Sequence, residues 1–292
     1  MPTNRLPLCL ADAQAFQRAL LPECLLECFL VGNLDREQAD AITQKTTAAL
    51  PSTAALPAEQ IPRRKMRVLP PGRTLTQFVA PNAAETNSAT EVYVQVGKDE
   101  GDKWVCLAVL NQLLEQPFYG ELRTKQQLGY IVQSSLTESE GVRALVFSVQ
   151  SAVQPPPEVE RRIEAFVRDF RTTLASLPDK DLAQVTQALA SQSTDVDQRL
   201  GAQAARLWGE IVQRRYDYGR PWRSAQRLRG VTREQLLAFF DKYVSPESPD
   251  SRRLVTHVFS KSAAPKELAV EKVDDEFYAP PPDRFAERVS VV

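Results

Sequence analysis

Six prolines between residues 51 and 81 constrain the fold of this chain more than any other feature, because they divide it into two unequal parts. They are Pro51, Pro57, Pro62, Pro70, Pro71 and Pro81. Proline lacks a backbone N–H and has a fixed φ, so a long helix cannot run through such a stretch. We therefore expect a domain boundary near residue 60, followed by a proline-rich connector over residues 61–81.

The part before the connector, residues 1–60, has the pattern of a helix, a strand and a second helix. Apolar residues keep helical spacing from Asp12 to Leu21, and the compact apolar run Leu25–Val31 predicts a buried strand. Asp35 fits the N-cap of a helix that reaches about Leu50.

The part after the connector, residues 82–265, has the pattern of a complete domain. Alternating apolar residues predict strands, and helical stripes predict helices. One strand is expected within the connector, at 74–79, and the others at 92–96, 128–136, 145–149 and 254–259; the helices are expected at 103–116, 159–177, 179–189, 200–211 and 232–243. Because the two do not alternate regularly, the predicted fold class is α+β, with a mostly antiparallel sheet packed by helices. Residues 266–292, which contain three consecutive prolines, are expected to form an irregular tail.

The helix and strand expected at residues 11–31 repeat the order and length of the pair expected at 232–259. If the second pair ends a domain, then residues 1–60 are the C-terminal end of a similar preceding domain. An isolated terminal helix and strand would leave an apolar face uncovered, so we expect this chain to be cut from a longer one.

Charge and cysteine content exclude several classes of function. The 36 Lys and Arg residues balance the 37 Asp and Glu residues, so neither a nucleic acid nor an anionic membrane is an expected partner. No apolar run is long enough to span a bilayer, and no signal peptide is expected.

The cysteines, at positions 9, 24, 28 and 106, form no C-x-x-C pair. Buried free thiols in a reducing compartment are expected, which favours the cytoplasm.

The sequence contains one histidine, His257, and this count limits the chemistry. An H-x-x-E-H zinc site, in either orientation, needs two imidazoles. No G-x-S-x-G elbow, P-loop or G-x-G-x-x-G loop is present. We expect no metal site and no self-contained catalysis in this chain, and His257 is interpreted as a hydrogen-bonded histidine of the last strand.

Two polar side chains, Arg123 and Tyr130, lie seven residues apart between a predicted helix and a predicted strand. An arginine fork and a tyrosine hydroxyl that point to one place can stabilise negative charge on a carbonyl oxygen. Gly129 permits a sharp entry into the strand. The alternative is structural: Arg123 pairs with a carboxylate such as Glu121 while the ring of Tyr130 packs in the sheet.

The run Leu122–Val132, with the letters LRTKQQLGYIV, resembles the signature of the C-terminal half of the insulysin/pitrilysin family of zinc metallopeptidases. Less specific matches support the resemblance. They are residues 30–34 (LVGNL), 147–151 (FSVQS), 162–166 (RIEAF), 208–211 (WGEI) and 257–258 (HV).

The resemblance implies an enzyme of four similar α+β domains of the metallopeptidase LuxS-like α/β-roll type, in two halves that close around an unfolded peptide substrate. It implies that the missing N-terminal half binds the zinc and that Arg123 and Tyr130 reach across to the substrate as catalytic residues. Tyr119 falls on a position that is usually aromatic, and is expected either to line the substrate chamber or to pack under the preceding helix. Gln126 stands where the family usually has an acidic residue, which puts an ion pair at this position in doubt.

The function that the resemblance implies is therefore that of the substrate-binding C-terminal half of a zinc metalloendopeptidase, inactive on its own. Its expected partners are the zinc-bearing N-terminal half, unfolded peptides and, as a possibility, a second copy of itself. The alternative is a non-catalytic peptide- or partner-binding scaffold of the same fold. A free-standing domain with an unrelated role is a third possibility.

Overall fold

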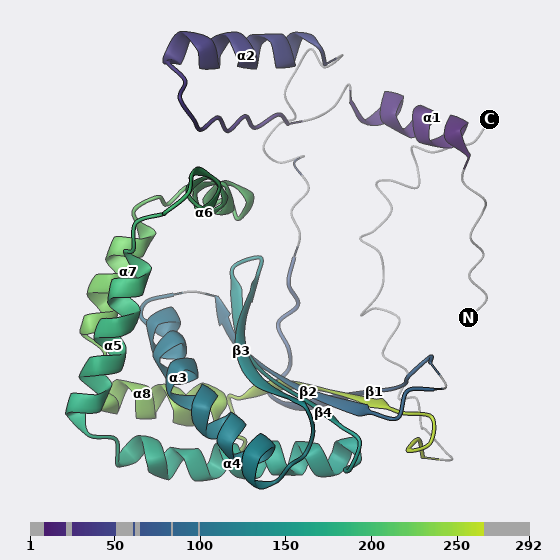
Figure 1. Cartoon of the computed structure of the whole chain (residues 1–292), viewed down its shortest axis with the longest axis vertical. Helices are drawn as coiled ribbons and strands as arrows, with labels where there is room; N and C mark the ends of the chain where they lie inside the picture. The colour runs from purple at the N-terminus through teal and green to yellow at the C-terminus, as the bar shows by residue number, and fades with distance from the viewer. Residues whose placement is uncertain are drawn as a thin grey trace. The chain divides into compact units, whose positions relative to one another are not determined.

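The computed structural model describes residues 9–21, 25–50, 61, 65–82, 84–98 and 100–265, which belong to two compact units. One unit contains the N-terminal residues up to Lys65 together with Val196–Tyr218. The other contains Met66–Asp195 and the chain from Gly219 onward. Figure 1 labels the elements of both units. Residues 51–60, residues 62–64 of the expected connector, the expected tail 266–292 and Cys24 lie outside the described residues.

The first unit contains helices α1 (Leu10–Leu20), α2 (Arg36–Ala48) and α6 (Leu200–Val212). The N-cap that was predicted for α2 is confirmed, because the Asp35 side chain accepts a hydrogen bond of 2.8 Å from the backbone N–H of Gln38. The ring of Phe29 stacks on that of Trp208 in α6, with 6.0 Å between the centroids.

The strand predicted at Leu25–Val31 is wrong. These residues have no strand assignment, and most of their side chains are exposed. A strand needs a neighbour to accept its backbone hydrogen bonds, and the described residues of this unit contain no second strand. Residues 11–31 therefore resemble residues 232–259 in their helix but not in their strand.

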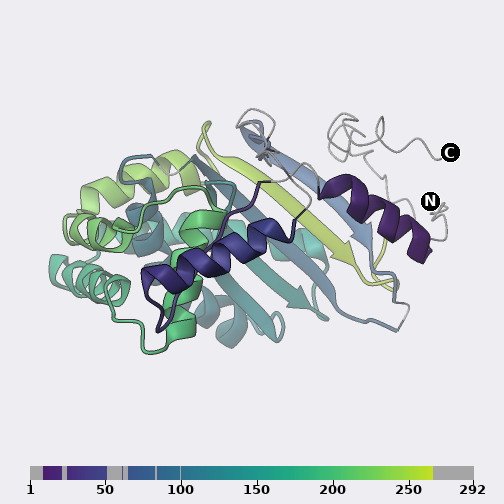
Figure 2. The same cartoon turned by 90° about the horizontal axis from the view of Figure 1, so that it is seen from above.

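The second unit is built on a five-stranded sheet with the order β1-β5-β2-β4-β3. Strand β1 pairs in parallel with β5, and the other three pairings are antiparallel (Figure 2). The strands are β1 (Gly72–Val79), β2 (Ser88–Lys98), β3 (Ile131–Ser139), β4 (Val142–Ser151) and β5 (Arg252–Phe259). All five predicted strands of this part of the chain are thus confirmed.

The β3–β4 hairpin closes on Glu140 and Gly141, whose φ angles are 51° and 76°. Positive φ at both central residues of a two-residue loop matches the right-handed twist of the flanking strands. This turn fixes the pairing of β3 with β4, which runs from Ile131 opposite Gln150 to Ser139 opposite Val142 without a bulge.

Helices cover one face of the sheet. Helices α3 and α4 lie against the strands, whereas α5 and α7 pack on each other and on α3. The bounds are α3 (Lys103–Phe118), α4 (Pro156–Ala175), α5 (Asp179–Ser193), α7 (Arg220–Arg229) and α8 (Arg233–Phe239), with π-helical turns η1 (Tyr119–Lys125) and η2 (Phe240–Val244). The α+β class and the mostly antiparallel sheet are confirmed. None of the described helices is both long and apolar enough to cross a membrane.

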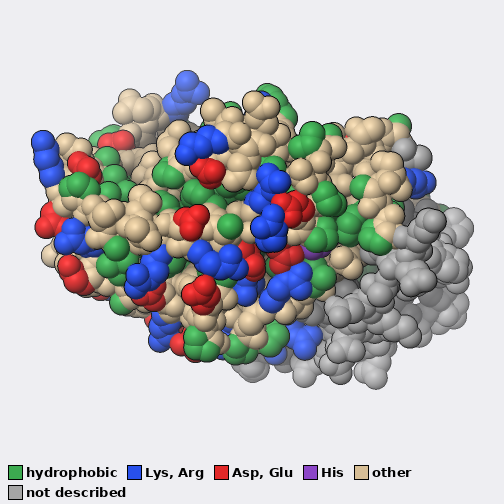
Figure 3. All heavy atoms as spheres, turned by 90° about the horizontal axis from the view of Figure 1, so that it is seen from below, with side chains coloured by type: hydrophobic (Ala, Val, Ile, Leu, Met, Phe, Trp, Pro, Cys, Tyr) green, Lys and Arg blue, Asp and Glu red, His purple; other side chains and the backbone are tan. Residues whose placement is uncertain are grey.

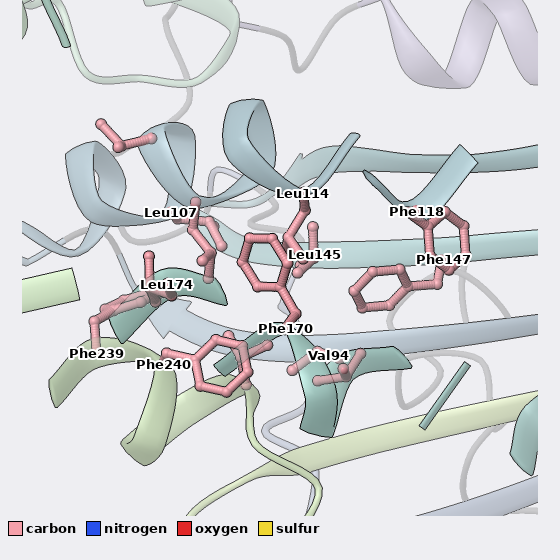
Figure 4. Close-up of a cluster of buried hydrophobic side chains, with 14 of the residues drawn as sticks. Val94, Leu107, Leu114, Phe118, Leu145, Phe147, Phe170, Leu174, Phe239 and Phe240 are labelled. Atoms are coloured by element: carbon pink, nitrogen blue, oxygen red, sulfur yellow. The ribbon is translucent and has the colours of Figure 1, made fainter. Parts of the chain in front are cut away.

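Aromatic side chains hold the helices to the sheet (Figure 4). The ring of Phe118, at the end of α3, lies 5.1 Å from that of Phe147 in β4 and 5.2 Å from that of Phe166 in α4, between ring centroids. Phe118 and Phe147 are fully buried. This contact fixes the C-terminal end of α3, from which η1 begins.

The helix expected at residues 103–116 extends further than predicted. Pro117 lies inside α3, and the helical chain continues through η1 to Lys125. A proline removes only its own N–H from the helical ladder, and the turn after it widens to π-helical bonding, as in the bond of 3.0 Å from the Gln126 N–H to the Glu121 carbonyl. Single π-helical turns of this kind occur frequently at functional sites.

Replacing Phe118 with alanine should lower the free energy of unfolding by about 3–5 kcal/mol, because it removes a fully buried ring between β4 and α4. Urea unfolding followed by circular dichroism measures this change. Phe78→Ala is the matched control, since Phe78 lies on the edge strand β1 and its side chain is exposed. Equal destabilisation by the two substitutions would contradict the assignment of Phe118 to the core.

Candidate functional site

Arg123 is presented by the π-helical turn η1. Its neighbour Leu122 is fully buried and anchors the turn to the core, so Arg123 lies where the turn emerges and is half-buried. The backbone N–H of Leu128 donates a hydrogen bond of 3.0 Å to the Leu122 carbonyl and closes the loop that follows. Gln127, inside this loop, has a φ of 51°. The chain therefore reverses within a few residues after Arg123.

Gly129 then brings the chain against β4. A Cβ at this position would lie 1.7 Å from the backbone oxygen of Gln150, so no side chain fits. The sequence predicted that Gly129 permits a sharp turn; the structure gives a different reason, which is the close approach of two backbones. Tyr130 follows directly, one residue before β3 begins at Ile131.

The structure brings the two predicted catalytic residues together. The guanidinium carbon of Arg123 lies 5.9 Å from the centroid of the Tyr130 ring, which is within the range of a cation–π contact. The Tyr130 side chain is 86% exposed. The guanidinium of the half-buried Arg123 thus lies beside an exposed tyrosine ring.

The structural alternative was that Arg123 pairs with a carboxylate such as Glu121 while the ring of Tyr130 packs in the sheet. Neither arrangement is observed. Glu121 accepts hydrogen bonds from Lys125 (2.9 Å) and from the Gln126 amide (3.1 Å), and no bond to Arg123 occurs. The hydrogen bond from Lys125 lowers the pKa of Glu121 most, and the one from Gln126 lowers it further. The buried Nε of Arg123 has no acceptor among the described residues. Tyr130 is exposed rather than packed in the sheet.

Gln126 forms a neutral bridge at the position where an acidic residue was expected from the resemblance. Its side-chain amide donates to Glu121 and its oxygen accepts a bond of 3.2 Å from Arg162 in α4. Arg162 in turn donates a bond of 2.7 Å to Glu158. An amide can join a carboxylate to a guanidinium because it carries both a donor and an acceptor. The bridge ties η1 to α4.

Tyr119, the third predicted site residue, is the first residue of η1 and its side chain is 46% exposed. It is therefore not buried under α3. Whether it contacts a substrate stays a prediction.

A second polar cluster, which the sequence did not reveal, lies inside the unit where β1, β5 and α4 meet. Arg73 in β1 donates two hydrogen bonds, of 2.5 Å and 2.8 Å, to the carboxylate of Glu160 in α4. The Nε2 atom of His257 lies 2.8 Å from the same carboxylate, and its Nδ1 lies 3.4 Å from the Gln77 amide. The partners come from distant parts of the chain, so no local pattern could have identified them.

Burial raises the pKa of Glu160, but hydrogen bonds from Arg73 and then His257 outweigh this effect and bring the pKa to about 2. His257 is 1% exposed and is held in this cluster. Among the described residues no three His, Cys, Asp or Glu side chains gather in a way that fits a metal ion. The expectation that an N-terminal half binds the zinc stays a prediction.

Acidic and basic side chains are interspersed on the outer face shown in Figure 3. Ion pairs of the described chain include Arg171 with Asp241 at 2.6 Å and Arg161 with Glu158 at 2.6 Å. This face has no single-sign field that would attract an anionic partner.

Gly129→Ala should lower the free energy of unfolding by more than about 1 kcal/mol, because the added methyl group collides with the Gln150 carbonyl. It should also displace Tyr130. Gly120→Ala is the matched control, since a Cβ at Gly120 in η1 meets open space. Thermal unfolding and the NMR shifts of Tyr130 in both variants provide the measurement. A Gly129→Ala variant as stable as Gly120→Ala would contradict the close approach.

The Glu160 cluster predicts a pH dependence of stability. The folded-state pKa, about 2, lies below the ordinary value of 4.5, so the stabilisation is complete above about pH 4.5 and is lost as the pH falls towards 2. Glu160→Gln should be less stable than the wild type at pH 7 and should lose less stability between pH 5 and pH 2. Urea unfolding as a function of pH measures this, with Glu115→Gln on the surface of α3 as a control. Parallel pH profiles for wild type and Glu160→Gln would contradict it.

Comparison with protein-family models gives a match over residues 109–208 to the C-terminal lobe domain 4 of PqqF-like PQQ synthase proteins. This region contains η1, Arg123, Tyr130 and the β3–β4 hairpin.

Curated proteins give matches over most of the chain. Human insulin-degrading enzyme is 28% identical over 252 residues, which are 85% of this chain and 24% of that protein. The nardilysin-like protein of Arabidopsis thaliana is 27% identical over 269 residues, which are 91% of this chain and 26% of that protein. The chain thus spans about a quarter of the length of these relatives.

Solved structures show the same fold. Pitrilysin matches with a TM-score of 0.65 and 23% identity, over 82% of this chain and 24% of that one. A peptidase M16 inactive domain from Pseudomonas fluorescens matches with a TM-score of 0.58 and 20% identity, over 87% of this chain and 58% of that one. The resemblance inferred from the sequence is confirmed: the chain is similar to insulin-degrading enzymes and a nardilysin-like protein over most of its length, has the fold of a part of pitrilysin, and matches a PqqF-like C-terminal lobe domain over residues 109–208.

Proposed function

We propose that this chain is the substrate-binding C-terminal part of a zinc metalloendopeptidase that hydrolyses peptides. The observation that carries the proposal is the meeting of Arg123 and Tyr130 on an open surface. Several curated relatives are named as insulin-degrading enzymes, one as nardilysin-like and one as a putative zinc protease. The zinc, whose chemistry is to activate water for attack on a peptide bond, would be bound by an N-terminal half.

In this proposal the two side chains act on the carbonyl of the peptide bond. The Tyr130 hydroxyl donates a hydrogen bond to the carbonyl oxygen, on which negative charge develops during attack. The guanidinium of Arg123 holds the neighbouring backbone through its planar fork of donors. The buried Nε of Arg123, which has no acceptor in the described chain, supports this role, because such a donor costs about 1–3 kcal/mol while it is unpaired.

The partners of this function are an unfolded peptide and the zinc-bearing half. A homodimer remains a further proposal. Cytoplasmic location is proposed from the free thiols of Cys9, Cys28 and Cys106.

A second candidate function is a non-catalytic scaffold that binds peptides or a partner. It is favoured by one observation, the similarity to a structure described as an inactive domain of an M16 peptidase. The two candidates differ in one respect: a scaffold does not need the Arg123–Tyr130 pair for turnover.

Removing either donor should lower kcat in the complete protein that contains this chain. Arg123→Ala and Tyr130→Phe are each expected to reduce kcat by about 10²–10³-fold, the typical effect of losing one oxyanion donor. A fluorogenic peptide assay with the zinc-bearing half present measures turnover, and circular dichroism confirms that the variants fold.

Arg36→Ala and Tyr218→Phe are the matched controls, because both residues are exposed in the first unit. Turnover within twofold of wild type in both Arg123→Ala and Tyr130→Phe would remove the catalytic role and favour the scaffold. Loss of turnover in the control variants as well would show that the effect is not specific.

A further inference from the structure

The two edges of the sheet are protected differently. Exposed edge strands offer unpaired backbone groups to other chains, and proteins blunt them with inward-pointing charges, prolines or bulges. Edge strand β1 has such devices: Pro70 and Pro71 precede it, and Arg73 points inward to Glu160. The opposite edge, β3, is the one to compare with it.

Along its nine residues strand β3 has one such device, the charged side chain of Glu138, which lies near the hairpin end on the same face as Val132 and Ser134. It contains no proline and no lysine, and its pairing with β4 has no bulge. Its one charged residue, Glu138, is paired with Arg143 at 3.0 Å. Among the described residues β3 pairs with β4 alone. Every second residue of β3 therefore directs its N–H and C=O away from the sheet.

The side chains of β3 alternate in a way that suits an uncharged ligand. Val132 and Ser134 are buried against the helices, whereas Ile131, Gln133 and Thr137 are exposed on the other face. The exposed set is apolar or neutral. It offers no charge to select for or against acidic or basic side chains of a ligand.

The position of strand β3 in the site indicates which ligand binds along its edge. β3 begins directly after Tyr130, so the open row of backbone groups starts at the Arg123–Tyr130 pair. A chain that pairs with β3 passes the phenol hydroxyl and the guanidinium, and a backbone carbonyl at that end can accept from them. One continuous surface thus combines a backbone ladder with two side-chain donors.

We propose that the open edge of β3 binds an extended, uncharged segment of the substrate peptide as a sixth strand of the sheet. Main-chain hydrogen bonds provide affinity with little dependence on sequence, as in other cases of strand addition to a sheet edge. The Arg123–Tyr130 pair fixes the register of the bound strand. The inference rests on the proposed function for its ligand class, but the edge itself can be tested separately.

The test uses the complete 292-residue chain and two synthetic peptides. The first is a capped, uncharged Val/Thr-rich peptide of about nine residues. The second has the same sequence with alternate amides N-methylated, which removes the donors on one edge. Amide hydrogen exchange by NMR is measured for the nine residues of β3, with the residues of β1 as an internal control.

The first peptide should slow the exchange of alternate β3 amides at least tenfold and leave β1 unchanged. The methylated peptide should bind at least tenfold more weakly and give no such protection. No protection of β3, or equal protection by the two peptides, would overturn the proposal. Protection of β3 without peptide, together with a dimer in sedimentation, would also overturn it, because the occupant would then be a second copy.

The same measurement on Tyr130→Phe and Arg123→Ala separates this inference from the proposed function. Both variants should still show alternate protection of β3, at several-fold lower affinity. If turnover is unaffected by the two substitutions while protection of β3 persists, the catalytic role fails and the strand-binding edge stands. If turnover falls as expected while the exchange of β3 never changes, the edge is not a binding site.

Discussion

The contact between Gly129 and the backbone of Gln150 is the constraint on which the candidate site depends. Two backbones approach so closely there that a methyl group would lie 1.7 Å from a carbonyl oxygen. Because the chain is held against β4 at this point, Tyr130 has to emerge at the edge of the sheet. The buried anchors Phe118 and Leu122 fix the other end of the turn. Arg123 and Tyr130 are thus positioned by the packing of their neighbours.

The site combines a rigid base with an open surface. On the inner side, the Gln126 amide links η1 to α4, and the aromatic contacts of Phe118 join α3 to the sheet. On the outer side the Tyr130 ring is exposed, and beneath it the buried Nε of Arg123 has no acceptor among the described residues. Polar groups presented on well-packed elements in this way are typical of binding sites, because little conformational freedom remains to be lost on binding.

Local patterns in the sequence predicted much of the fold, whereas the roles of Arg123 and Tyr130 were implied by the resemblance and stay predictions. The alternation of Val92, Val94 and Val96 and the N-cap at Asp35 both predicted their elements, since each depends on neighbours along the chain. Helix α7 was not predicted, because its Arg-rich sequence buries only Ala225 and Leu228. Such a short apolar stripe gives little periodic signal.

Features that depend on distant partners could not be predicted. The cluster of Arg73, Glu160 and His257 joins three elements, and nothing in the sequence near His257 indicates its partners. The strand expected at Leu25–Val31 was wrong because apolar character alone does not provide a hydrogen-bonding neighbour. The exposure of Tyr130 likewise follows from the approach of Gly129 to β4, which is a tertiary contact.

The central claim is that Arg123 and Tyr130 together donate hydrogen bonds to a peptide carbonyl. The most direct test follows the guanidinium group itself. The measurement is the NMR resonance of the Arg123 Nε–H during titration of the chain with a capped, uncharged peptide. The account predicts a shift that saturates with peptide and becomes smaller in Tyr130→Phe. A resonance that stays unchanged while the peptide binds elsewhere on the chain would contradict it.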